Sequence, residues 1–323
     1  MIIKGIGAST HLDAHNQKLT KDDLERIKDD IKNGKYASAI KIEHDLTVMP
    51  IGKVIDADII KLEDGEYALF ITQEIFDETF GECKNETGET WFIQKSIYDN
   101  RPFLEDIEDE KIKNIQIRID QCNFKKEDYQ KLINLYINEY NLEACYIMRK
   151  SLIPDPEIVF AFLTGTFLGK LIEKMTEKMM DDLSKIYDLI KKVVMNTVKY
   201  VINKERPITY VFIEKNEYIL EFIVITKEPN VLFEALNILF TSNIREQIDN
   251  FLNFFNNDDI NIRDISKIQF LYDIKLKQWQ LHYVNTITGI SIGSEKCYKH
   301  TQNCISDMSK KMKQKNKIIK WFY

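Results

Sequence analysis

The sequence has few of the residues that break secondary structure, and it lacks the short motifs of several large enzyme classes. Only 11 glycines and 6 prolines occur in 323 residues, which argues against a long disordered linker. The chain contains no glycine-rich phosphate-binding loop, no paired zinc-type cysteines and no His-Glu-x-x-His motif. Common nucleotide-binding and metalloprotease signatures are therefore absent.

Charge and cysteine content also exclude some classes of partner and compartment. The formal net charge is −6, with no wide basic field, so we expect no nucleic-acid partner. The five cysteines are odd in number and scattered along the chain. The N-terminal segment, MIIKGIGAST, is too short and too quickly polar for a signal peptide. We therefore expect reduced thiols and a cytoplasmic location.

Long hydrophobic runs are missing as well. The most apolar stretch is 158–172, and Glu157 and Lys170 bound only about a dozen uninterrupted residues, fewer than the ~20 that span a bilayer. Gly165 and Gly169 have the spacing of closely packed helices. We expect a buried helix here and no stable membrane span, with a membrane-acting effector as a residual alternative.

The pattern that remains predicts an α+β protein. Thr20 precedes two acids and is expected to cap a helix that runs to about Ile31 and stops at Asn33-Gly34. A hairpin turn is expected at Asp64-Gly65. Further elements of the first part are expected at 1–8, 38–44, 51–61, 66–72 and 90–98 as strands, and at 73–84 as a helix.

The composition changes after Pro102, where an acidic run predicts a boundary near 104–112. The expected domains are 1–104 and 113–323. The second begins with a β-α-β unit at 113–148 and continues with a long helical region at 156–202. A β-rich region at 207–300 and a basic tail at 310–323 follow, with residues 230–255 expected as helix.

One histidine stands at the end of an alternating strand. His44 closes residues 38–44, and Pro50 and Gly52 follow before the next strand. A strand end fixes the direction of an imidazole, so His44 is a candidate for presentation to a cleft.

Several short motifs follow one another in the order seen in a known family. An Asp-containing loop at 12–16 is followed by the helix start Leu19-Thr20-Lys21-Asp22-Asp23-Leu24, then His44, the segment Ile51-Gly52-Lys53-Val54 and the Asp64-Gly65 turn. In this order the first third of the chain resembles the prohead maturation proteases of tailed phages, serine peptidases related in fold to the herpesvirus assemblin. The resemblance implies a small β-rich assemblin-like domain, joined to a mixed domain with long helices and an antiparallel sheet.

The resemblance also implies catalytic residues. Ser96, in QKSIY, stands at the family's usual separation from the histidine, so Ser96 would be the nucleophile and His44 its general base. The residue that orients the imidazole stays open. Asp120 lies on a later expected strand, His11 would match the second histidine of assemblin-type sites, and Asp45 is the weakest candidate because it would leave a strand on the opposite face.

Ser96 departs from the family in one respect. It is flanked by Lys95 and Ile97, where these proteases usually have small residues that leave room for an oxyanion site. The sequence is therefore compatible with two functions. One is a serine peptidase that processes itself or acts on a protein partner. The other is a catalytically inactive protease-like sensor or binding module that controls a C-terminal effector domain. A phage-related or antiphage-defence setting would suit either, and an oligomer would be compatible with both.

A second candidate site lies near the C-terminus. Cys297, His300 and Cys304 form a compact run of zinc-type ligands, and His282 on a preceding strand would supply a fourth. The alternative is a polar loop with two thiols, and the sequence predicts no cofactor.

Overall fold

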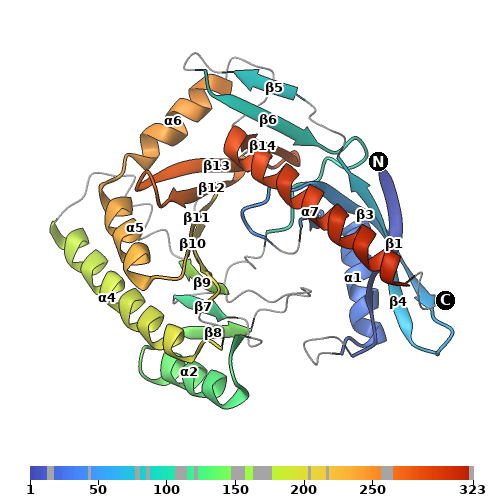
Figure 1. Cartoon of the computed structure of the whole chain (residues 1–323), viewed down its shortest axis with the longest axis horizontal. Coiled ribbons are helices and arrows are strands. Elements are labelled where there is room, and N and C mark those ends of the chain that lie inside the picture. The colour runs from blue at the N-terminus through green and yellow to red at the C-terminus, as the bar shows by residue number, and fades with distance from the viewer. Residues whose placement is uncertain are drawn as a thin grey trace. The chain divides into compact units, whose positions relative to one another are not determined.

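The computed structural model describes residues 1–12, 18–42, 45–76, 81–84, 88–105, 115–119, 123–146, 157–162, 177–202, 205–215, 218–255 and 265–319. Within these ranges the chain has six helices, a four-strand antiparallel sheet and a ten-strand mixed sheet, so the α+β class is confirmed (Figure 1). The chain forms two compact units, residues 1–105 with 282–323, and residues 106–281.

The four-strand sheet lies in the first unit. Its order is β1 (Ile2–Ser9), β4 (Tyr67–Ile75), β3 (Gly52–Lys61), β2 (Ala39–Ile40), and every pairing is antiparallel. The β3–β4 hairpin turns at Gly65, whose φ of 92° favours glycine, so the predicted turn is confirmed. The strand expected at 38–44 is shorter than predicted, and His44 lies outside the described residues.

Helix α1 (Lys21–Asn33) covers one face of this sheet. Thr20 and Asp23 form a capping box, in which the Thr20 hydroxyl accepts a hydrogen bond from the Asp23 amide, as the sequence predicts. Leu24 and Ile31 of the helix pack with Val54, Leu69 and Ile71 of the sheet. This core positions the C-terminal end of α1 beside the loop that follows β6.

The first unit also contains β5 (Gly81–Lys84), β6 (Thr90–Lys95), β14 (Ile290–Ser294) and helix α7 (Glu295–Ile319). The helix predicted at 73–84 is wrong, because β4 continues to Ile75 and β5 pairs with β6. The polar loop considered at 297–304 is also wrong, since these residues lie within α7. Residues 282–323 belong to the second expected domain, 113–323, but in the structure they lie in the first unit, where β14 pairs with β6 and α7 packs on both strands.

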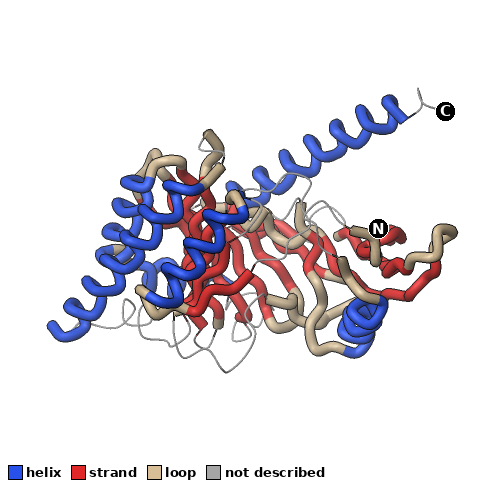
Figure 2. The backbone as a smooth tube through the Cα atoms, turned by 90° about the horizontal axis from the view of Figure 1, so that it is seen from below, coloured by secondary structure: helices blue, strands red, loops and turns tan. Residues whose placement is uncertain are grey.

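The second unit begins with the predicted β-α-β arrangement, β7 (Gln116–Ile119), α2 (Lys126–Asn138) and β8 (Glu143–Tyr146), with β7 and β8 parallel. The elements that follow are β9 (Glu157–Phe162), α4 (Glu177–Tyr200), β10 (Ile208–Lys215), β11 (Ile219–Thr226), α5 (Pro229–Thr241), α6 (Ile244–Phe255) and β12 (Ile265–Asp273), and the chain then enters β13 (Gln278–Thr286). Figures 1 and 2 show its helices together on one side of its strands.

Residues 157–162 correct the long helix predicted at 156–202. They form β9, which pairs in parallel with β10 and antiparallel with β7, so their apolar side chains belong to a sheet rather than to a helix. The helical part that is described is α4, which contacts α2 and α5. Residues 163–176 lie outside the described ranges. No helix of the described chain combines the length and the apolar content that crossing a membrane requires.

Candidate functional site

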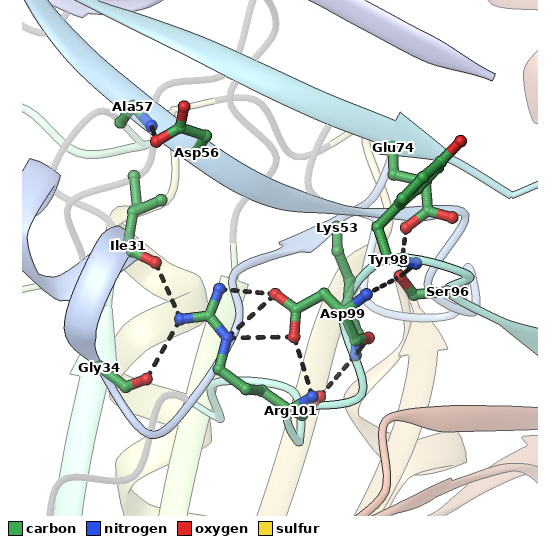
Figure 3. Close-up of polar contacts among 10 residues, drawn as sticks. All are labelled: Ile31, Gly34, Lys53, Asp56, Ala57, Glu74, Ser96, Tyr98, Asp99 and Arg101. Atoms are coloured by element: carbon green, nitrogen blue, oxygen red, sulfur yellow. Dashed lines mark hydrogen bonds and ion pairs between the residues drawn. The ribbon is translucent and has the colours of Figure 1, made fainter.

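Ser96 lies in the turn that follows β6, and its hydroxyl is fully used there (Figure 3). The hydroxyl donates to Oε2 of Glu74, and it accepts hydrogen bonds from the amides of Tyr98 (3.1 Å) and Asp99 (2.7 Å). The other carboxylate oxygen of Glu74 accepts the Ile97 amide at 2.7 Å. Ser96 therefore anchors the turn to β4, and its one proton is committed to a buried carboxylate.

Lys53 holds the far end of the same turn. Its side chain is fully buried, and the ammonium donates to the carbonyls of Asp99, at 2.7 Å, and Arg101. The ammonium also lies 4.9 Å from the ring centroid of Phe103. Burial lowers the pKa of Lys53 to about 8. Gly289 has a φ of 71° and approaches so closely that any side chain there would collide with the ammonium.

Arg101 connects the turn to helix α1. Its guanidinium donates to the carboxylate of Asp99, with Nε 3.0 Å from each oxygen, and to the carbonyls of Ile31 (2.8 Å) and Gly34 (3.1 Å) (Figure 3). These carbonyls lie at the C-terminal end of the helix, where backbone acceptors lack partners within the helix. Burial would raise the pKa of Asp99, but the hydrogen bonds from Arg101 outweigh it and lower that pKa.

The expected partners of Ser96 are not brought to it by the described residues. His44 and Asp120 both lie outside the described ranges, so the His44–Ser96 pair and the role of Asp120 stay predictions. His11 bonds the exposed carboxylate of Asp64 at the β3–β4 turn, with 2.7 Å between Nε2 and Oδ2. Sequence reasoning missed the roles of Glu74 and Lys53. Their strands also contain charged or polar residues that are exposed or half-buried, so the sequence alone does not show that these two side chains are buried.

A second cluster joins the segment after His44 to helix α7. Nε2 of His300 lies 3.1 Å from Oδ2 of Asp45, 3.1 Å from the Thr47 hydroxyl and 3.7 Å from Sγ of Cys304. Hydrogen bonding to Asp45 raises the pKa of His300. Burial would raise the pKa of Asp45, but the hydrogen bonds from His300 and Thr47 lower it overall. Both shifts favour an ion pair between Asp45 and His300, which lie far apart in sequence.

The other two predicted metal ligands, His282 and Cys297, contact the backbone of Thr47. His282 Nε2 is 2.8 Å from the carbonyl oxygen of Thr47, and the Cys297 thiol donates to the same oxygen at 3.7 Å. Burial lowers the pKa of His282 to about 4 and raises that of Cys297 to about 12. Both side chains are therefore neutral near pH 7 and hold the backbone at Thr47. The structure brings His300 and Cys304 together with Asp45 in place of Cys297.

The cluster is not arranged as a Cys-His-Asp relay. In such a relay the nucleophile and the carboxylate contact opposite nitrogens of the imidazole. Here Asp45 and Cys304 both approach Nε2 of His300. The arrangement suits three ligands around one point better than proton transfer along a line.

Comparison of this chain with family models, with curated proteins and with solved structures finds no match.

Proposed function

We propose that this protein is a protein-binding module, in which strand β1 takes up an extended segment of a partner and Ser96 serves as a structural anchor. The observation that carries the proposal is the open edge of the four-strand sheet. β1 is the terminal strand of that sheet among the described residues, and its side chains are largely exposed. An edge strand with apolar side chains is a template for strand addition.

The register defines which backbone groups point outwards. Met1 and Ile75 exchange backbone hydrogen bonds, at 2.7 and 2.8 Å, and pairs of this kind alternate along an antiparallel ladder. Ile3 and Gly5 therefore bond β4, and the amides and carbonyls of the alternate residues Ile2, Lys4 and Ile6 point away from it. These groups would form the ladder with an added strand.

The exposed side chains suggest the chemistry of the partner. Ile2, Ile3 and Ile6 are 42%, 41% and 57% exposed, which is high for isoleucine. Lys4 lies between them and is exposed. In a pairing of two copies centred on Lys4, the two lysines would face each other, and like charges placed opposite are unfavourable. We therefore propose a different protein as partner, with apolar residues around an acidic residue that faces Lys4.

The hydrogen bonds of Ser96 support this proposal over the serine peptidase. A serine needs a base that accepts its proton, and the Ser96 proton is held by Glu74, whose second oxygen is also occupied. The peptidase, the likeness to the prohead-protease fold and the phage-related or defence setting stay predictions. Control of an effector region by the binding module is part of the proposal.

The proposal is tested with a synthetic peptide of alternating β-branched residues around a central glutamate. Binding to the full chain is measured by calorimetry, beside a peptide whose central residue is lysine. We expect the glutamate peptide to bind more tightly by about 1.4- to five-fold, from cross-strand pairing energies of ~0.2–1 kcal/mol. The Lys4→Glu variant should reverse the preference.

A matched pair of proline variants locates the binding surface. Lys4→Pro removes an outward-facing amide and leaves the ladder to β4 intact, as proline is tolerated at such edge positions. It should abolish binding and keep the fold, whereas Ile3→Pro should disrupt the β1–β4 ladder itself. Unchanged peptide binding by folded Lys4→Pro, or no binding by the wild type, would overturn the proposal.

A further inference from the structure

We propose that Asp45, His300 and Cys304 bind a zinc-class divalent metal ion that keeps one coordination position open. The two ligands of α7 lie one helical turn apart, so they share a face of the helix. Asp45 faces them from the segment that precedes β3. None of the three residues belongs to β1, so the metal site is separate from the proposed binding edge.

The distances between the donor atoms suit a tetrahedral ion. The three donor atoms all lie within 4.8 Å of one another. Ideal zinc bonds of ~2.0–2.1 Å to nitrogen or oxygen and ~2.3 Å to sulfur give edges of about 3.3–3.6 Å. The observed edges from His300 are 3.1 Å to the Asp45 oxygen and 3.7 Å to the Cys304 sulfur. Small side-chain adjustments would close the site around an ion.

A single hydrogen on Nε2 of His300 cannot bond every group that lies against it. Nε2 of His300 carries at most one hydrogen, yet a carboxylate, a hydroxyl and a sulfur all lie against it. The Thr47 hydroxyl donates to Oδ1 of Asp45, so it offers His300 only a lone pair. A cation in place of that hydrogen would bond Nε2 of His300, Oδ2 of Asp45 and Sγ of Cys304 at once.

The surroundings orient the ligands. The amide and the hydroxyl of Thr47 both donate to Oδ1 of Asp45, at 2.8 and 2.7 Å, which leaves Oδ2 directed at His300. His282 and Cys297 in turn hold the Thr47 carbonyl. Fixing ligands through outer hydrogen bonds is a regular property of metal sites and raises their affinity.

The donor set indicates the class of ion. Sulfur with imidazole and carboxylate favours zinc or cobalt over magnesium or calcium, which prefer oxygen alone. The described residues supply three ligands to this group. Three protein ligands leave a position for water or an external donor, as in zinc sites that act on a ligand.

Cobalt substitution tests the site. Full-length protein stripped with a chelator is titrated with Co²⁺, and then with Zn²⁺ in competition. We expect one equivalent bound with a thiolate-to-cobalt absorption band, which Cys304→Ser abolishes while weakening Zn²⁺ binding at least tenfold. Cys83→Ser, a control at a half-buried cysteine of β5, should keep the band. Asp45→Asn should keep the band with weaker affinity.

A measurement on the unmodified protein covers the case in which Cys304→Ser does not fold. X-ray absorption of the zinc-loaded wild type should show one sulfur at ~2.3 Å with nitrogen or oxygen donors completing the shell. No stoichiometric binding at micromolar metal, a zinc shell without sulfur, or a band that survives in Cys304→Ser would overturn the inference, leaving a hydrogen-bonded ion pair only.

Discussion

Replacing Ser96 by alanine separates a structural hydroxyl from a catalytic one. The change removes the donor to the Glu74 carboxylate, a hydrogen bond to a charged group worth about 1.5–3 kcal/mol. It also removes the acceptor of the part-buried Asp99 amide, worth about 0.5–1.5 kcal/mol. We therefore expect the free energy of unfolding to fall by about 2–4 kcal/mol.

The assay is urea denaturation of the wild type, Ser96→Ala and a control, Ser184→Ala. Ser184 is exposed on α4, so its replacement should change the free energy of unfolding by less than about 0.5 kcal/mol. In a Glu74→Gln background the loss from Ser96→Ala should be smaller by about 1 kcal/mol, because hydrogen bonds to charged acceptors are about twice as strong as neutral ones.

Two outcomes would refute this reasoning. A Ser96→Ala protein as stable as the wild type would show that the hydroxyl does not anchor the turn. A wild-type protein that cleaves itself or a protein substrate, with cleavage lost in a fully stable Ser96→Ala, would restore Ser96 as a nucleophile.

Three further predictions concern charge and backbone strain. Burial lowers the pKa of His282 to about 4, so between pH 6.5 and 4 the unfolded chain binds a proton at this residue and the folded chain does not. The free energy of unfolding should therefore fall by roughly 3 kcal/mol as the pH drops from about 6.5 to 4. Urea titrations across that range should show a flatter dependence for His282→Gln, and an equal slope would contradict the assignment. Gly289→Ala should lower the free energy of unfolding by about 1–3 kcal/mol in thermal melts, while Gly5→Ala, where a methyl group meets nothing within 4 Å, should not; equal melting would count against the strain. Glu221 and Lys267 form a buried ion pair 3.0 Å apart. Lys267→Met, which removes one partner, should lower the free energy of unfolding measured in urea by about 3–5 kcal/mol. A decrease below about 1 kcal/mol would argue against the burial of the pair.

Local sequence signals predicted much of the fold. The Thr20 cap, the Asp64-Gly65 turn and the β-α-β unit from β7 to β8 depend on residues near one another, and each is confirmed. Residues 157–162 were misassigned because short apolar runs look alike in helices and buried strands. Their partner β10 begins far along the sequence, so pairing could not be read locally.

The candidate sites were harder to predict because their contacts are non-local. Asp45 looked the weakest partner for His44, and its contact with His300 joins residues 255 positions apart. Cys297 was grouped with His300 by spacing, but burial turns its thiol to the Thr47 carbonyl. The compact run of zinc-type ligands at 297–304 contains two of the three ligands in the proposed metal site, and only the fold supplied the third.

Amide hydrogen exchange along β1 tests the central claim most directly. In the free protein the Ile3 and Gly5 amides should be protected by β4, while those of Ile2, Lys4 and Ile6 should exchange quickly. Adding the glutamate-centred peptide should protect these three outward amides selectively. If they stay unprotected at peptide concentrations that saturate binding, strand addition at β1 is contradicted.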